Sequence, residues 1–377
     1  METSYNANGP PSPRIVTNLR ALLHDWTPHP LLHRTEQMEK LSFHLRMFAR
    51  SGVPGHFILH GPPGTGKTLT VRSLLPALQR ENPDLRVAVI CCREREMENF
   101  AAIARSVGVN MGRGWGFGEI WEKVRESLGD SPFLVVLDEF DKASRHNEFL
   151  FSLLDHPKVC LVGAANDLSF YRHIDDGRIL SRLNATSIHF PPYTPSQLTD
   201  ILKQRAEAGL APGSWDEGLL SLCAALTSSS FRGNARYAVD LLRASAFRAE
   251  EKGKKRIEEE DVREAHGALS EEELLSPLKE LSRVELVYLY ALASRPGATI
   301  REVKGFGDEL ASRLGLNFSP TTGATAFRRF YSLNLARFER KGRGRGKGVD
   351  HYVHPLLPPE KVKRRIATIL GLDHEVS

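Results

Sequence analysis

Apolar runs and amphipathic stretches alternate along the first half of the chain. The strand-length apolar runs are 55–60, 85–92, 132–137 and 158–165, and the stretches with helical spacing are 15–22, 36–49, 69–78, 98–107 and 117–128. Continuous apolar runs are typical of strands buried on both faces of a parallel sheet, with helices covering those faces. This order therefore predicts an α/β domain with a parallel sheet.

Beyond about residue 190 the pattern becomes almost entirely helical. Thr194 and Pro195, with Gln197 close behind them, have the composition of a capping box that begins a helix. The charged run 250–256 is interpreted as a solvated turn between helices. This part of the chain is predicted to form a helical lid.

The pattern changes again near 275–277. Stretches 283–293, 299–314 and 322–333 have helical spacing, and short segments flank a glycine-basic tip at 341–348. Helices followed by a hairpin in this order describe a winged helix-turn-helix. We therefore expect a disordered N-terminus over 1–14, an α/β nucleotide-binding domain over 15–190, a helical lid over 191–272 and a winged-helix domain over 273–377.

A complete phosphate-loop signature stands between the first strand and the helix after it. The pattern G-x-x-x-x-G-K-[ST] is matched by Gly61-Pro62-Pro63-Gly64-Thr65-Gly66-Lys67-Thr68. In this setting backbone N–H groups surround phosphate oxygens, Lys67 reaches the β- and γ-phosphates, and Thr68 ligates Mg²⁺. We therefore predict that the loop and the next residue, Leu69, bind a nucleotide. The sequence contains no guanine-selecting Asn-Lys-x-Asp, which agrees with ATP.

Acidic residues follow the third apolar run. Asp138 and Glu139 stand at the carboxyl end of a predicted strand, where an open α/β sheet places its ligand site. We assign Asp138 to Mg²⁺ and Glu139 to orienting and deprotonating the attacking water. Asp141 and Lys142 continue the turn and are interpreted as surface residues. Asn166 follows the next strand, and its side chain either contacts the attacking water or the γ-phosphate, or forms an Asx turn or helix cap.

Composition narrows the class of protein only slightly. The 377 residues are 41% hydrophobic and 26% charged, and no apolar run approaches the roughly 20 residues of a membrane span. The first residues are polar rather than signal-like, so we expect a cytoplasmic, nucleoid-associated protein without a membrane partner. The cysteines lack Cys-x-x-Cys spacing, which argues against a zinc site or a disulfide framework.

Positive charge is concentrated at the C-terminal end. Residues 281–377 contain 17 Lys and Arg against 9 Asp and Glu, a balance of +8, which leaves 34 against 37 of the chain's 51 and 46 for the part before. This asymmetry indicates a polyanionic partner, with a solvated charged face as the alternative.

Two groups of residues in this region are candidates for binding double-stranded DNA. Thr325, Arg328 and Arg329 lie on the predicted recognition helix and would approach the major groove. The glycine-basic tip would approach phosphates or the minor groove through Lys341, Arg343, Arg345 and Lys347. A winged helix can also bind protein, but the basic balance favours DNA.

The order of these motifs resembles an AAA+ ATPase. The order of motifs continues with Arg178-Ile179-Leu180-Ser181-Arg182-Leu183 and then with Gly233-Asn234-Ala235-Arg236. More narrowly, the chain is similar to the archaeal origin-recognition and cell-division-cycle initiator family. That similarity rests on the terminal winged helix, on His33-Arg34-Thr35-Glu36-Gln37, and on Phe190-Pro191-Pro192-Tyr193 followed by Gln197-Leu198. It covers nearly the whole chain after about Ile15.

The resemblance implies an ATP-dependent DNA replication initiator. Such a protein binds replication-origin DNA beside other initiator copies or paralogues, and it helps to recruit or load the replicative helicase. ATP with Mg²⁺ would act as a switch that is reset by slow hydrolysis to ADP. Two alternatives remain: a clamp-loader-like or remodelling AAA+ ATPase, and a regulatory ATPase whose winged helix binds protein.

The resemblance also implies roles for single residues. His33 and Arg34 would lie near the adenine, and Tyr193 belongs to the same nucleotide-binding set. Asn166 would be sensor 1, and Arg236 would be the sensor 2 arginine that contacts the γ-phosphate from the lid.

Two arginines compete for the finger that reaches a neighbour's nucleotide. We favour Arg182 over Arg178, because Gly177 replaces the proline found before the finger position in archaeal relatives. Arg113 lies within 99–128, where these initiators carry an inserted helical element that contacts DNA. Arg113 is therefore either a phosphate contact or an ordinary surface-loop residue.

Overall fold

The computed structural model describes residues 14–112, 114–333, 335–342 and 349–372. The chain divides into two compact units between His266 and Gly267. The first unit holds the α/β part and most of the lid, and the second holds the C-terminal helices and hairpin. Among the described residues, every helix is too short or too polar to cross a bilayer.

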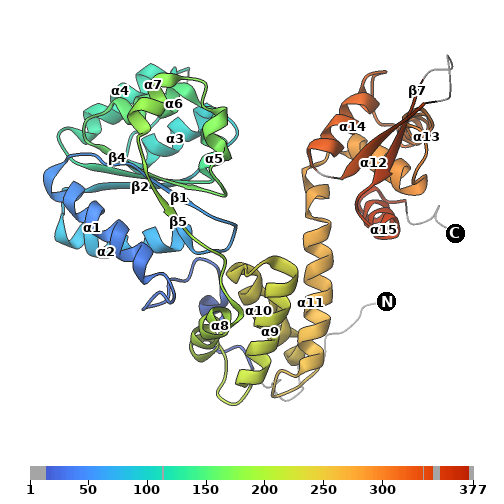
Figure 1. Ribbon diagram of the computed structural model, residues 1–377, viewed down its shortest axis with the longest axis horizontal. Coiled ribbons are helices and arrows are strands. Elements are labelled where there is room, and N and C mark those ends of the chain that lie inside the picture. The colour runs from blue at the N-terminus through green and yellow to red at the C-terminus, as the bar shows by residue number, and fades with distance from the viewer. Residues whose placement is uncertain (1–13, 113, 334, 343–348, 373–377) are drawn as a thin grey trace. The chain divides into compact units, whose positions relative to one another are not determined.

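The first unit is built on a parallel sheet that has, among the described residues, five strands in the order β2-β3-β4-β1-β5 (Figure 1). The strands are β1 (Phe57–His60), β2 (Arg86–Cys91), β3 (Phe133–Asp138), β4 (Val159–Ala165) and β5 (Thr186–His189). Strands β3 and β4 are buried along almost their whole length, as their apolar runs predict. The edge strand β5 buries only Ile188, so it lacks the apolar run by which the others are predicted.

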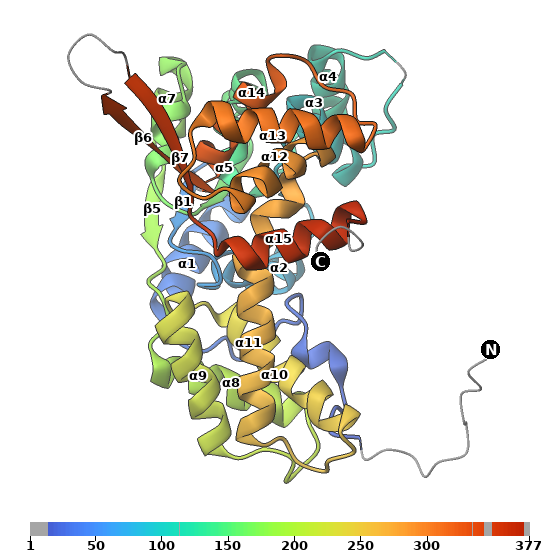
Figure 2. The same ribbon diagram turned by 90° about the vertical axis from the view of Figure 1, so that its right-hand side faces the viewer.

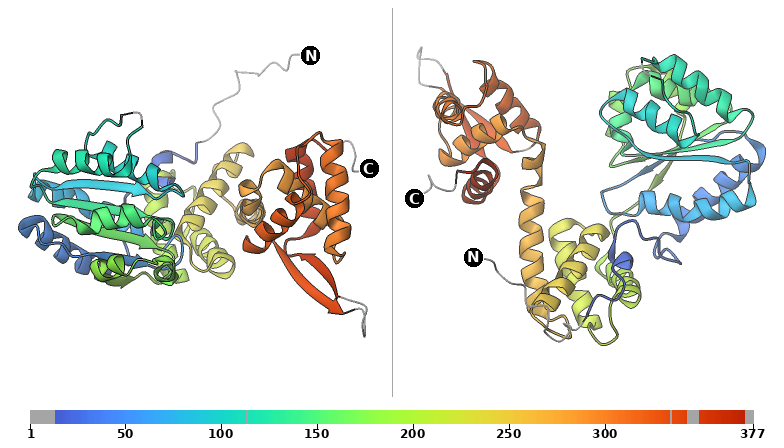
Figure 3. Two further views of the ribbon diagram at one scale, coloured as in Figure 1. Left: turned by 90° about the horizontal axis from the view of Figure 1, so that it is seen from above. Right: turned by 180° about the vertical axis from the view of Figure 1, so that it is seen from behind.

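Helices cover both faces of the sheet (Figure 3). On one face lie α1 (Thr35–Ser51) and α2 (Lys67–Glu81), which share a core with Leu134 and Val136. The opposite face, with Val135, is covered by α3 (Glu96–Ser106), α4 (Phe117–Leu128), α5 (Phe140–Ala143), α6 (Asn147–Asp155) and α7 (Gly177–Leu183). Because all strands run the same way, the residues that follow β1, β3 and β4 meet at one edge of the sheet.

The lid follows β5 and is helical, as predicted. Its helices are α8 (Pro195–Gly209), α9 (Glu217–Phe231), α10 (Ala235–Glu251) and α11 (Glu259–Leu274). The predicted capping box begins α8: the Thr194 hydroxyl accepts from the Gln197 N–H at 3.3 Å, and Gln197 Oε1 accepts from the Thr194 N–H at 3.1 Å. These bonds satisfy N–H groups that the helix itself leaves without partners.

The segment 15–33 forms many bonds with the lid, although it precedes the sheet in the sequence. The N–H groups of its first two residues donate to Glu250 Oε1 at 2.6 and 2.8 Å, and Val16 forms an antiparallel bridge with Leu210. These contacts keep the start of the segment extended, so the predicted helix is reduced to the 3-10 turn η1 (Leu19–Leu22). In space this segment accompanies the lid, whereas the sequence analysis grouped it with the α/β domain.

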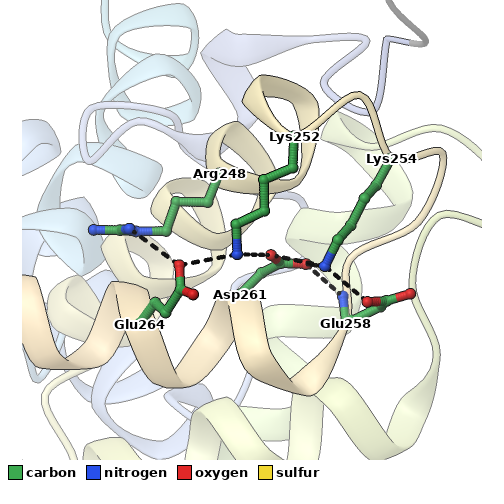
Figure 4. Close-up of polar contacts among 6 residues, drawn as sticks. All are labelled: Arg248, Lys252, Lys254, Glu258, Asp261 and Glu264. Atoms are coloured by element: carbon green, nitrogen blue, oxygen red, sulfur yellow. Dashed lines mark hydrogen bonds and ion pairs between the residues drawn. The ribbon is translucent and has the colours of Figure 1, made fainter.

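An ion-pair network joins α10 to α11 (Figure 4). Lys252 and Lys254 each lie 3.0 Å from a carboxylate oxygen of Asp261, whose side chain is fully buried. Glu264 pairs with Lys252 at 3.0 Å and with Arg248 at 3.4 Å. A buried carboxylate is tolerated only when it is paired and hydrogen-bonded. The charged run that was interpreted as a solvated turn therefore supplies the cations that hold these two helices together.

The second unit contains the predicted helices and hairpin around its own core (Figure 2). Its elements are η3 (Ser276–Glu280), α12 (Arg283–Ser294), α13 (Ile300–Arg313), α14 (Thr322–Ser332), β6 (Ala336–Gly342), β7 (Val349–Pro355) and α15 (Pro359–Leu370). Strands β6 and β7 pair antiparallel, so the order matches a winged helix-turn-helix. Helix α15 was not predicted, and it contributes Val362, Ile366 and Leu370 to the core.

Candidate nucleotide site

A cavity of about 520 Å³ lies between the carboxyl edge of the sheet and the lid. Among the residues selected from the sequence, its wall contains Pro63, Gly64, Thr65, Gly66, Lys67, Thr68, Leu69, Asp138, Glu139, Asn166, Tyr193 and Arg236. Segments far apart in the sequence thus contribute to one cavity. Its volume lies in the range of small-molecule sites.

The phosphate loop closes around the ammonium group of Lys67. This residue begins α2, and its Nζ donates to the carbonyl oxygens of Gly61 at 2.5 Å and Pro62 at 3.0 Å. Burial lowers the pKa of Lys67 to about 8, while the nearby Asp138 carboxylate acts in the opposite direction. Lys67 is therefore a buried cation at neutral pH. Gly61 and Pro62, which do not line the cavity, serve as its acceptors.

Gly64 meets two constraints at once. Its φ is +73°, and a Cβ atom there would lie 1.8 Å from Asn234 Oδ1. Its carbonyl accepts from the Ala235 N–H at 3.1 Å, so the loop touches the first residues of α10. Asn234 caps that helix by accepting from the Arg236 N–H at 2.9 Å, which fixes Arg236 in the first turn. The loop and the lid are therefore in direct contact beside the cavity.

The acidic turn after β3 lies at the same carboxyl edge of the sheet as the phosphate loop. Glu139 has a left-handed φ of +54°, and its Oε2 lies 2.5 Å from Lys142 Nζ. The hydrogen bond from Lys142 lowers the pKa of Glu139. Asp141 accepts from the Asn166 N–H at 3.1 Å, and burial raises the pKa of Asp141. Asp141 and Lys142 both line the cavity, a position that the sequence analysis missed.

Thr68 and Asp138 are oxygen donors of the kind that suits Mg²⁺, and both line the cavity. In the part of the chain that the structure describes, no group of three or more His, Cys, Asp or Glu side chains forms a metal site by itself. Mg²⁺ usually combines one or two protein ligands with water and the phosphates of a substrate. The residues present therefore fit an ion that is shared with a nucleotide.

His33 and Arg34 do not line the cavity, which differs from the expectation that they lie near the adenine. His33 Nε2 lies 2.8 Å from Asp200 Oδ2 on α8. Arg34 is buried; its Nε donates to the Thr65 carbonyl at 2.9 Å, and its guanidinium lies 3.8 Å from the ring centroid of Tyr193. Arg34 therefore holds the phosphate loop through the Thr65 carbonyl.

The remaining wall is formed mainly by residues that the sequence analysis did not select. From the N-terminal segment come His24, Asp25, Pro28, Leu31 and Leu32, and from α8 come Ile201, Gln204 and Arg205. No local signature marks these residues. The only hint in the sequence is that the proline-bearing link 26–34 leads towards the phosphate loop.

Arg178 and Arg182 lie on α7, outside the wall of this chain's own cavity. Arg178 pairs with Asp176 and Arg182 with Asp155, each at 2.7 Å. Both guanidinium groups lie over the ring of Phe151, at 4.7 and 4.8 Å from its centroid. The two arginines are thus exposed, and each is paired with a carboxylate.

The DNA-binding candidates on α14 share its exposed face. Thr325, Arg328 and Arg329 are exposed, while Phe327 and Phe330 between and beside them are buried. Arg329 pairs with a neighbouring carboxylate, that of Glu280, at 3.4 Å. Arg113, Arg343, Arg345, Lys347 and the side chain of Lys341 lie outside the described residues.

Comparison with known proteins connects this arrangement to one group. The model of the AAA ATPase domain matches residues 30–111, and that of the Cdc6 AAA+ ATPase-type lid domain matches residues 199–267. The ORC1-type DNA replication protein of Methanothermobacter thermautotrophicus is 31% identical over 347 residues, which cover 91% of this chain and 94% of the relative. ORC1-type DNA replication protein 1 of Archaeoglobus fulgidus is 32% identical over 326 residues, which cover 81% and 79%.

A solved structure extends this similarity to the fold. The Aeropyrum pernix ORC1 protein, determined in complex with DNA, aligns with 96% of this chain and 99% of its own chain. The TM-score is 0.81 at 28% sequence identity. The similarity that the sequence motifs indicate is therefore confirmed over almost the whole chain.

Proposed function

The chain belongs to the family of ORC1-type DNA replication proteins, and we propose that it is an ATP-switched initiator that binds replication-origin DNA. The observation that carries this proposal is the composition of the cavity. One wall joins the phosphate loop and the Asp138–Glu139 turn of the α/β core to Arg236 of the lid. A γ-phosphate is the group that these residues would hold in common.

In this proposal the chain's own residues divide the work of hydrolysis. The loop N–H groups and Lys67 bind the β- and γ-phosphates, and Glu139 accepts a proton from the attacking water. Thr68 and Asp138 hold Mg²⁺, which when bound neutralises charge on the phosphate oxygens. Asn166 orients the water, and Arg236 contacts the γ-phosphate from the lid.

Slow hydrolysis is supported by the state of Glu139. Lys142 holds its carboxylate at 2.5 Å and lowers the pKa of this group, which makes Glu139 a weaker base. Because Oε2 is engaged by Lys142, a proton from the attacking water would go to Oε1 unless Lys142 moves. A low rate of this kind suits a switch better than a machine with rapid turnover.

We further propose that the surface of α7 acts on a second copy of the chain. Arg182, or in its place Arg178, would reach the nucleotide of the neighbour, because neither arginine lines the cavity of its own chain. A finger supplied from outside makes hydrolysis depend on assembly. Other initiator copies and the replicative helicase are the proposed protein partners.

DNA binding is assigned to the second unit. The exposed face of α14 presents Thr325, Arg328 and Arg329, which can approach base edges because the helix is fixed by its buried phenylalanines. The basic tip between β6 and β7 is expected to contact phosphates and to add affinity for any sequence.

This division is tested with an origin duplex from the source genome and a scrambled duplex of equal length, both measured over a salt series. Arg328→Ala or Arg329→Ala should narrow the difference in binding free energy between the two duplexes by about 1–3 kcal/mol, the value of a good base contact. Replacing Arg343 and Arg345 together should weaken the binding of both duplexes. The slope of log affinity against log salt concentration should fall by about one unit per lost phosphate contact.

The matched control is Arg364→Ala, an exposed arginine on α15, which should change neither duplex by much. If replacing Arg343 and Arg345 abolishes origin binding alone, at an unchanged salt slope, the assignment is reversed. Equal binding of both duplexes by the unaltered protein would remove the origin-binding proposal.

A further inference from the structure

Arg205 of α8 is a buried cation that lines the cavity and also holds the N-terminal segment. Only 5% of the Arg205 surface is exposed to solvent. The guanidinium donates to the carbonyl oxygens of Ala21 and Leu23 at 2.8 Å, and to that of Trp26 at 3.1 Å. It also lies 4.6 Å from the ring centroid of Trp26. Burial lowers the pKa of Arg205 to about 10, so the group stays charged at neutral pH.

Other lid residues hold the same segment, one of them between these bonds and one beyond them. His24 Nε2 lies 3.0 Å from Asp240 Oδ2 on α10. Further along, Gln204 Nε2 on α8 donates to the Pro30 carbonyl at 2.9 Å. The part of the cavity wall that comes from residues 24–32 is therefore attached to the lid at several points.

The chemistry of this wall suits a planar heteroaromatic base. Leu31, Leu32 and Ile201 supply apolar surface, and Gln204 supplies an amide. Arg205 Nε is buried and has no hydrogen-bond partner among the described residues. This N–H therefore lacks an acceptor, and the ring nitrogens of a purine are acceptors that could bind it.

We propose that Arg205 is a positioning residue that builds the base-binding wall and fastens it to the lid, a proposal that rests on ATP being the ligand of the cavity. The two ends of one nucleotide are then held by different parts of the first unit. The loop at the sheet edge, with Arg236 of the lid, holds the phosphates, and α8 with the attached N-terminal segment holds the base. ATP engages both groups of residues, whereas inorganic triphosphate lacks the base and engages only the phosphate-binding residues.

The test compares ATP, ADP and inorganic triphosphate, each with Mg²⁺, by calorimetry on the full chain. Arg205→Met should lower the affinity for ATP and for ADP about tenfold or more, because several hydrogen bonds to a charged group are lost. It should change the affinity for inorganic triphosphate less than about twofold, because the loop is not altered. Arg205→Lys keeps the charge and part of the bonding, and should recover part of the ATP affinity.

Hydrogen exchange gives a second measurement that a uniform loss of stability would not reproduce. In Arg205→Met the backbone amides of residues 19–32 should exchange faster, while those of β1, β3 and β4 should keep their rates. Arg248→Met is the matched control, since Arg248 also lies on the lid but pairs with Glu264. That variant should leave both affinities and the exchange of residues 19–32 unchanged.

If Arg205→Met does not fold, Gln204→Leu removes a single bond to the same segment without leaving a buried charge unpaired, and should show a smaller loss in the same direction. Equal losses of ATP and triphosphate affinity, or ATP affinity equal to that of the unaltered protein, would overturn the role of Arg205. Failure of the unaltered protein to bind either ligand would instead refute the proposed function.

Discussion

The phosphate side and the base side of the cavity are built in opposite ways. On the phosphate side, Lys67 bonds the carbonyl of Gly61, six residues away in the sequence, so the phosphate loop itself is closed within one short stretch. On the base side, Arg205 bonds the carbonyl of Ala21, 184 residues away. A motif can therefore identify the first, whereas only the folded chain reveals the second. Two substitutions and a change of pH test this difference between the phosphate side and the base side.

The largest effect is expected at Glu139, which should affect the reaction without affecting either binding side. Glu139→Gln should lower single-turnover ATP hydrolysis by about 10²–10⁴-fold, the usual contribution of a positioned general base. ATP and inorganic triphosphate should still bind within about twofold of the unaltered protein, because the amide keeps the shape of the side chain. Hydrolysis at the normal rate would exclude Glu139 as the base.

The next largest effect is expected at Lys67. Lys67→Ala should weaken ATP and inorganic triphosphate alike by about 10- to 100-fold, since a hydrogen bond to a charged group contributes about 1.5–3 kcal/mol. Calorimetry with both ligands decides the matter. If the affinity for ATP falls while the affinity for triphosphate does not, the division of the cavity into a phosphate side and a base side is wrong.

The smallest effect is a dependence on pH that belongs to the phosphate side alone. Burial lowers the pKa of Lys67 to about 8, so its cation is present below that pH and is lost above it. Affinity for triphosphate should therefore fall as pH rises from 7 to 9, by up to about tenfold for a contact that needs the charged form. The Lys67→Ala variant supplies the baseline for titration of the phosphate itself. Parallel curves for the two proteins would contradict the assignment.

Local chemistry explains what the sequence could predict. The signature of the loop, the acids after β3 and the capping box of α8 each depend on residues within a few positions of one another. The buried strands were predictable because burial on both faces requires continuous apolar runs. The roles of the single site residues stay predictions, although most of them share one cavity wall.

The missed features depend on tertiary contacts. Edge strand β5 buries one residue and so carries no pattern. Asp141 and Lys142 were interpreted as surface residues because nothing local reveals that the acidic turn faces a lid. Arg34, which the resemblance places near the adenine, bonds the Thr65 carbonyl and does not line the cavity, so its role stays a prediction. Each of these depends on which distant segment packs against the residue.

Attachment of the first described residues to the lid has a consequence for how the chain is made. Ile15 donates to Glu250, 235 positions later, and the whole sheet is encoded between them. At synthesis rates of about 5–20 residues per second, the N-terminal segment waits roughly 10–50 s on the ribosome for its partners. The sheet can assemble during that interval, so the base-binding wall is expected to be the last part of the first unit to form. A nascent chain stopped before α8 would have a phosphate loop but no place for a base.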